Sequence, residues 1–196
     1  MPEEQAHYNT ANETMSAEEY RQKYGGEAQP QLDGLASLAK EHDVALAIDP
    51  GRTSGLAWTD GDRVVTGTAS FWDIWSALSA LHPGAALEPT GGASVPPVWE
   101  ASDCCVLLEA PYKSRQSMGA QPAVAYNSGQ IAREAELLAE WLRGDGIVYG
   151  LIEHDPSQQG PKWDSSFARK IVGDWEGPDN EHVRDAIRLL FLYGFL

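Results

Sequence analysis

The sequence has few cysteines, few basic residues and no long apolar run. No segment reaches the ~18 consecutive apolar residues that a membrane-spanning helix needs, and the acidic beginning lacks the basic and apolar regions of a signal peptide. The only two cysteines, Cys104 and Cys105, are adjacent in an apolar segment, which excludes a disulfide framework and a zinc site of ordinary ligand spacing. We therefore expect a cytoplasmic protein with two buried thiols.

Basic residues are scarce, with 14 Lys and Arg against 29 Asp and Glu and a formal net charge of −15. Such a balance disfavours nucleic-acid binding, because Lys and Arg contacts to phosphates supply most of the non-specific affinity. The charge is uneven, however. Residues 1–43 carry nine acidic and three basic residues, whereas residues 111–196 carry twelve and nine. A local basic face in the second half of the chain is therefore compatible with binding to DNA.

The 196 residues, 42% of them hydrophobic, are enough for one well-buried domain and a modest extension. Residues 1–43 are polar and acidic, and we predict that they form a partly flexible extension with short helical segments at 16–24 and 32–42. The domain itself then spans residues 44–196. Within it, residues 83–103 are rich in Pro and Gly and are predicted to form a long loop.

Hydrophobic periodicity and turn signals predict five strands and four helices in this domain. An Asp-Gly-Asp turn at 60–62 indicates a hairpin between the second and third strands, and Asn127 with Gln130 forms a capping pair that predicts the start of the second helix. The predicted strands are 44–49, 54–59, 63–69, 104–109 and 147–153, and the predicted helices are 70–81, 127–143, 165–172 and 181–195. Three antiparallel strands followed by parallel crossovers are typical of a ribonuclease H-like α/β fold, a five-stranded mixed sheet flanked by helices.

Three acidic residues stand where such a fold can hold a metal ion. Asp49 ends the first predicted strand, Glu109 ends the fourth, and Asp185 follows His182 by three residues on the last helix. Because the first and fourth strands are neighbours in this sheet, Asp49 and Glu109 are expected to meet, and the helix can present the other two residues on one face. Converging carboxylates are what two-metal phosphodiester hydrolysis requires. We therefore predict a metal-dependent nuclease with Mg²⁺ as cofactor and Mn²⁺ as its substitute.

Three segments resemble the signature segments of RuvC-type Holliday-junction resolvases, the crossover junction endodeoxyribonucleases. They are residues 48–55 (IDPGRTSG), 107–112 (LLEAPY) and 182–186 (HVRDA). The resemblance covers residues 44–196. It implies a homodimer that resolves four-way or branched DNA by paired nicks and leaves 5′-phosphates, with the helix near Asn127 at the dimer interface. The catalytic and metal-binding set that it implies is Asp49, Glu109, His182 and Asp185.

Basic and aromatic residues outside this set are predicted to contact DNA. Tyr112 stands where such resolvases place an aromatic residue that stacks at the open junction centre, and residues 169–173 resemble the basic segment that precedes the last helix in the family. Most tryptophans are expected in the core, and only Trp163, beside Lys162 in a loop, is a candidate for contact with nucleic acid. The predicted DNA-binding residues are Arg52, Tyr112, Lys113, Arg115, Lys162, Arg169 and Lys170.

Other functions of the same fold are alternatives to this one. An actin-like or kinase-like ATPase would use residues 49–55 to hold phosphates, but it needs a second domain and a second phosphate loop, and we find neither in the sequence. A ribonuclease H-like nuclease that acts on flaps, single strands or RNA stays open, as does a non-catalytic DNA-binding adaptor. The acidic extension and the long loop depart from the resolvase pattern. Such divergent members are typical of bacteriophage genomes, which would place the protein in the host cytoplasm.

Overall fold

Five strands form a single mixed sheet in a computed structural model, which describes residues 16–19, 41–42, 44–79, 104–110, 122–144, 147–153 and 162–196. The strands are β1 (Val44–Asp49), β2 (Ser54–Thr59), β3 (Val64–Ala69), β4 (Cys104–Ala110) and β5 (Tyr149–Glu153). Their order is β3-β2-β1-β4-β5. The β1–β2 and β2–β3 pairs are antiparallel, whereas β1–β4 and β4–β5 are parallel. The sheet is therefore the ribonuclease H-like one that the sequence predicts.

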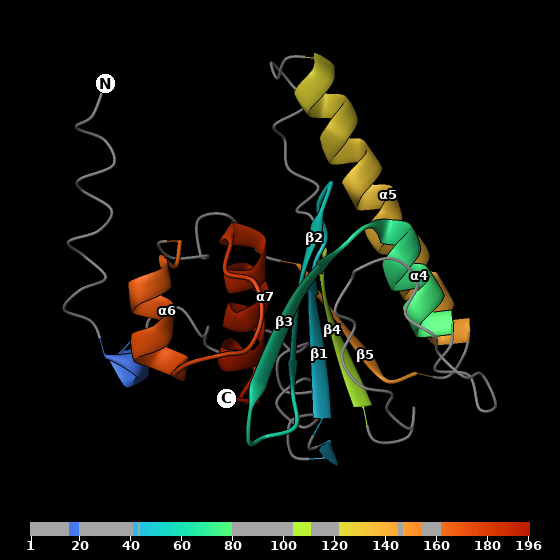
Figure 1. Ribbon diagram of the computed structural model, residues 1–196. Coiled ribbons are helices and arrows are strands. Elements are labelled where there is room, and N and C mark those ends of the chain that lie inside the picture. The colour runs from blue at the N-terminus through green and yellow to red at the C-terminus, as the bar shows by residue number, and fades with distance from the viewer. Residues whose placement is uncertain are drawn as a thin grey trace, which may run out of the picture.

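Helices cover both faces of this sheet (Figure 1). They are α4 (Phe71–Ser79), α5 (Pro122–Gly144), α6 (Ser165–Val172) and α7 (Glu181–Leu192). Side chains alternate between the two faces along each strand, so that Ala45 and Ala47 of β1 pack in the α6 and α7 layer, and Leu46 and Ile48 pack in the α4 and α5 layer. The central strands are apolar on both faces for this reason, and Cys104 and Cys105 are buried free thiols as predicted.

Two predicted element starts are wrong. The helix that was expected to begin at Asn127 begins at Pro122, because proline at the first helical position needs no N–H partner and has a preset φ. Asn127 therefore lies inside α5 and does not cap it. Strand β5 begins at Tyr149 rather than at Ile147, because the N–H of Ile147 donates to the carbonyl of Leu142 at 3.0 Å and continues the end of α5.

Two glycines with positive φ stand at turns. Gly61 (φ 87°) occupies the predicted hairpin turn, where the Asp60 carboxylate accepts hydrogen bonds from the N–H groups of Asp62 and Arg63. Gly194 (φ 85°) follows α7, which ends at residue 192 rather than at the predicted residue 195. A left-handed residue of this kind redirects the chain after a helix.

Several predicted features lie outside the described residues. They are most of the extension at 1–43, the loop at 83–103, and the residues Tyr112, Lys113 and Arg115. Within the extension, Ser16 and Glu19 form a capping box, and Ala17 packs against the core on the α7 side. In the ranges that the structure does describe, no helix combines the length and the apolar character needed to cross a membrane.

Candidate catalytic site

Asp49 and Glu109 lie side by side at one end of the sheet. The parallel pairing of β1 with β4 makes them neighbours on adjacent strands. They alternate in step with Ala47 and Leu107, which pack on the α7 face. Both carboxylates are therefore directed to the side of the sheet that α7 covers, as the sequence predicts.

The N-terminal part of α7 brings two more predicted residues, His182 and Asp185, to this end of the sheet. Asn180 caps the helix, since its side-chain oxygen accepts the N–H of Val183 at 3.1 Å. Gly55 of β2 touches the helix backbone so closely that a Cβ atom there would lie 2.1 Å from the carbonyl carbon of His182. Only glycine permits this approach, and the approach determines the distance between α7 and the strands.

The His182 imidazole is held by a carboxylate. Its Nδ1 lies 2.8 Å from Oδ2 of Asp49, and we assign the donated proton to the ring. This hydrogen bond is the main cause that raises the pKa of His182 above its ordinary value. The ring also lies against Gly51, where a Cβ atom would be 3.2 Å from Cε1. Since the side chain is 48% exposed, its second nitrogen is placed to exchange a proton with a bound molecule.

The three carboxyl groups repel one another in a poorly hydrated place. Burial raises the pKa of Glu109 to about 8, and the carboxylates of Asp49 and Asp185 add to the rise. Burial also raises the pKa of Asp185, where Asp49 adds to the effect and the Arg188 guanidinium opposes it. A raised carboxyl pKa means that negative charge is disfavoured at this site in the absence of a cation.

Two residues beside the carboxylates were missed by the sequence analysis. Arg188 is only 3% exposed, and its Nη1 lies 3.6 Å from Oδ1 of Asp185. Tyr193 is the other, because burial raises its pKa to about 12 and the Glu109 carboxylate adds to that rise. Arg188 left a signal in the sequence, since it follows Asp185 by one helical turn. Tyr193 lies beyond the end of α7, where no periodic pattern fixes its direction.

The carboxylate groups have the right chemistry to bind a divalent cation, although their oxygens do not converge on one point. Across the described ranges, no three His, Cys, Asp or Glu side chains are arranged so as to hold an ion. Asp49 is instead turned to His182, and Asp185 to Arg188. Carboxylate oxygens are nonetheless the ligands that Mg²⁺ prefers. A cation bound by Asp49, Glu109 and Asp185 would relieve their mutual repulsion, which the guanidinium only partly offsets.

The basic residue Arg169 of α6, predicted to bind DNA, is engaged within the protein. Its Nη1 lies 2.6 Å from Oδ1 of Asp174, and its Nη2 lies 3.6 Å from Oδ2 of Asp179. Its guanidinium also stacks over the Trp175 ring at 4.2 Å from the centroid. Arg169 therefore ties α6 to the segment that leads into α7.

Of the remaining basic residues of the predicted set, the three that the structure describes lie on the surface. Lys162 forms an ion pair with Glu181 at the start of α7. Lys170 is exposed on α6, and Arg52 is exposed in the loop between β1 and β2, three residues after Asp49. The structure brings Arg52 to the end of the sheet where Asp49 and Glu109 lie, while Lys170 belongs to the α6 layer.

Two tryptophans contradict the sequence analysis. Trp163, the predicted nucleic-acid contact, is buried and packs against Phe167 and Phe191 at centroid distances of 5.6 Å each. It belongs to the core. Trp72 is an exception to the expectation that most tryptophans are core residues, since it is 72% exposed, because Ile74 and the partly buried aromatic residues of α4 already fill the face that packs on the sheet.

Comparisons with known proteins find similarity to one solved structure. A scan against protein-family models finds no match, and a search of curated proteins finds none either. Among solved structures, T. thermophilus RuvC in complex with a Holliday junction substrate is similar, with a TM-score of 0.42 and 17% identity over 78% of this chain and 93% of that chain. The strand order and the crossovers of the sheet, rather than this similarity, define the fold.

Proposed function

We propose that this protein is a metal-dependent endonuclease that cuts branched DNA, and that its substrate is the four-way junction. One observation carries the proposal: Asp49, Glu109 and Asp185 gather at the end of β1 and β4 below the N-terminal part of α7, with His182 hydrogen-bonded to Asp49. Burial raises the pKa values of Glu109 and Asp185, and buried carboxyl groups with raised pKa values are typical of functional sites.

Each residue of the site has a role in phosphodiester hydrolysis. Asp49, Glu109 and Asp185 would hold Mg²⁺, with Mn²⁺ as a substitute. The bound metal supplies an activated water and charge stabilisation at the phosphate. The imidazole of His182, oriented through Nδ1 by Asp49, carries a proton at Nε2 to or from the reacting oxygens. Arg188 stays below the carboxylates and limits their repulsion.

The choice of a four-way junction is supported by the three sequence segments that resemble the resolvases. The first segment supplies Asp49, the second supplies Glu109, and the third supplies His182 and Asp185. Paired nicks that leave 5′-phosphates need two active sites, which is the reason to propose a homodimer. Ala135, Leu138 and Leu142 of α5 are buried within their own subunit, so a dimer would use the other surfaces of that helix.

A cleavage assay with a matched pair of variants tests this proposal. A labelled synthetic four-way junction and a linear duplex of the same sequence are incubated with Mg²⁺, Mn²⁺ or EDTA. Asp49→Asn is compared with Asp62→Asn, which makes the same chemical change in the exposed hairpin turn at the far end of the sheet. We expect paired, metal-dependent nicks in the junction alone, abolished by Asp49→Asn and retained by Asp62→Asn.

The same assay separates the alternatives. Cutting of flaps, single strands or RNA in preference to junctions would change the proposed substrate but would leave the metal-dependent mechanism in place. Tight junction binding without cutting under any metal would identify a non-catalytic adaptor. A readout that needs no cleavage is the rise in Tm on addition of Mg²⁺, which Asp49→Asn should diminish and Asp62→Asn should leave unchanged.

A further inference from the structure

Trp72, the second residue of α4, presents an exposed indole at the surface. It is 72% exposed, whereas Trp58, Trp163 and Trp175 are buried. Its ring meets the edge of the neighbouring Phe71 ring, with centroids 5.1 Å apart and an interplanar angle of 76°. A large aromatic face left in water next to a second ring is a common feature of binding sites.

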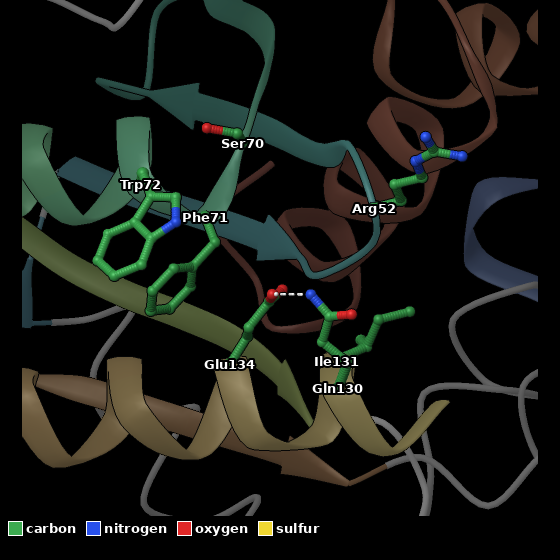
Figure 2. A pocket seen from close by; sticks show the side chains of 7 residues that line it. All are labelled: Arg52, Ser70, Phe71, Trp72, Gln130, Ile131 and Glu134. Atoms are coloured by element: carbon green, nitrogen blue, oxygen red, sulfur yellow. Dashed lines mark hydrogen bonds between the residues drawn. The ribbon is translucent and has the colours of Figure 1, made fainter. Parts of the chain in front are cut away.

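The indole borders a cavity between α4 and α5. The cavity has a volume of about 450 Å³, within the range of pockets that hold small molecules. Figure 2 shows Phe71 and Trp72 on the α4 side, with Gln130, Ile131 and Glu134 opposite on α5. The lining is Arg52, Ser70, Phe71, Trp72, Gln130, Ile131 and Glu134.

The polar lining is ordered rather than random. Nε2 of Gln130 donates to Oε1 of Glu134 at 2.9 Å, which leaves the Gln130 carbonyl and the second Glu134 oxygen as acceptors. Arg52 belongs to the lining from the β1–β2 loop, and its guanidinium is directed away from the two rings and from Glu134 (Figure 2). An aromatic face, adjacent hydrogen-bonding groups and a nearby cation match the three parts of a nucleotide: the base face, the base edge and the phosphate.

We propose that this cavity takes one unpaired nucleobase of the DNA substrate. The base stacks on Trp72, its edge bonds to Gln130 and Glu134, and the adjoining phosphate contacts Arg52. The inference rests on the proposed function and adds a subsite to it. An unpaired base is specified because a base must leave the duplex stack before an aromatic side chain can cover its face, and branch points supply such bases at low cost.

The cavity and the carboxylates share one end of the sheet. Ser54 at the start of β2 pairs with Ala69 at the end of β3, so that residues 70–72 begin beside the loop that follows Asp49. The carboxylates face α7, whereas the cavity lies on the α4 and α5 face, and Arg52 stands in the loop between them. A DNA strand that crosses this end of the sheet can reach both the cavity and the carboxylates. The base would then be bound beside the phosphate that is cleaved, and not at the carboxylates themselves.

Binding measured without metal tests the inference independently of cleavage. The probe is a branched oligonucleotide with a single unpaired 2-aminopurine, titrated with protein in EDTA and followed by its fluorescence. Stacking on Trp72 should quench the probe. Trp72→Ala should weaken binding roughly ten-fold to a hundred-fold, Trp72→Phe should retain most of the affinity, and Arg52→Met should weaken binding and lower the salt dependence.

Val148→Ala is the matched control, because Val148 is also an exposed apolar side chain but lies beside β5. It should bind as the wild type does. Three results for Trp72→Ala would overturn the inference. They are unchanged affinity and quenching, a lowered Tm with unchanged affinity, and loss of a dimer with unchanged affinity. The last result would show that the indole contacts a second copy of the chain. If the wild type binds the probe through Trp72 but cuts no junction, the proposed function fails and the subsite stands.

Discussion

The Nδ1 atom of His182 lies 2.8 Å from Oδ2 of Asp49, although 133 residues separate them in the chain. The contact joins the end of β1 to the first turn of α7. It depends on the close packing of that turn against Gly55, and it fixes which ring nitrogen faces the surroundings. A histidine fixed in this way can transfer protons at Nε2 while Asp49 stabilises its charged form.

His182→Ala should therefore lower the single-turnover rate of junction cleavage by about 10²–10⁴-fold, the usual contribution of a general acid or base. The rate is measured from pH 5 to pH 9, and one titrating limb of the wild-type profile should disappear in the variant. His42→Ala, which alters a histidine before the start of β1, serves as the control and should keep the wild-type profile. A His182→Ala rate within twofold of the wild type would remove this residue from the mechanism.

Metal-free stability should fall as the pH rises from about 4.5 to about 8. The pKa of Glu109 rises from 4.5 to about 8 on folding, so the native state binds more protons in this window and loses stability as they dissociate, by up to about 1.4 kcal/mol per pH unit for one proton. The raised pKa of His182 acts in the same direction, since its contribution is complete below 6.5 and is lost above the folded value. Urea unfolding in EDTA at several pH values measures the slope.

Glu109→Gln should flatten this slope, because the amide does not titrate. Saturating Mg²⁺ should also stabilise the wild type more at pH 8 than at pH 5, since the cation competes with protons for the carboxylates. A metal-free stability that rises through this window would contradict the close placement of the carboxyl groups.

Arg188→Met should leave the carboxylates without their buried counter-charge. Loss of one partner of a buried ion pair costs about 3–5 kcal/mol, and the cost should be largest above pH 8, where Glu109 is ionised. Addition of Mg²⁺ should recover more stability in the variant than in the wild type. Arg133→Met, which removes two exposed ion pairs of α5, should change stability by no more than about 0.5 kcal/mol. Equal stability of Arg188→Met and wild type at every pH would refute this role.

The strands and the acids were predictable because both leave local signals. Apolar runs that end at Asp49 and Glu109 mark the strands and their ends together, and the neighbouring strand order follows from the sequence of elements. The tryptophans were not predictable, because residue type indicates that an indole prefers burial but not which face of a helix the sheet leaves uncovered. Trp163, which was predicted to contact nucleic acid, is therefore buried, whereas Trp72 is exposed. For Arg188 the sequence indicated only its spacing of one helical turn from Asp185, and its burial was not predictable because it depends on the packing around it.

Gly55→Ala should disturb the site without changing any polar group. The added Cβ would lie 2.1 Å from the carbonyl carbon of His182 and 2.5 Å from the nitrogen of Val183, so α7 must move away from β2. Overpacking of this kind costs about 1–3 kcal/mol or more, and the shift should weaken the Mg²⁺-induced rise in Tm. Gly129→Ala, a helical position in α5 with nothing within 4 Å of an added Cβ, should instead gain about 0.5–1 kcal/mol. Equal behaviour of the two variants would refute the close approach.

The ion pairs of α6 predict opposite effects for two neighbouring substitutions. Arg169 is held by Asp174, by Asp179 and by the Trp175 ring, so a DNA phosphate must compete with carboxylates of the protein for it. Asp174→Asn removes the nearer of these carboxylates and should raise DNA affinity several-fold. Lys170→Ala should lower affinity equally for junction and duplex, and it should reduce the slope of log affinity against log salt concentration by about one. Fluorescence anisotropy in EDTA at several salt concentrations measures both effects. Suppose that Asp174→Asn leaves affinity unchanged while Lys170→Ala lowers it. Arg169 would then only join α6 to the segment before α7, and Lys170 would be the single residue of α6 that contacts DNA.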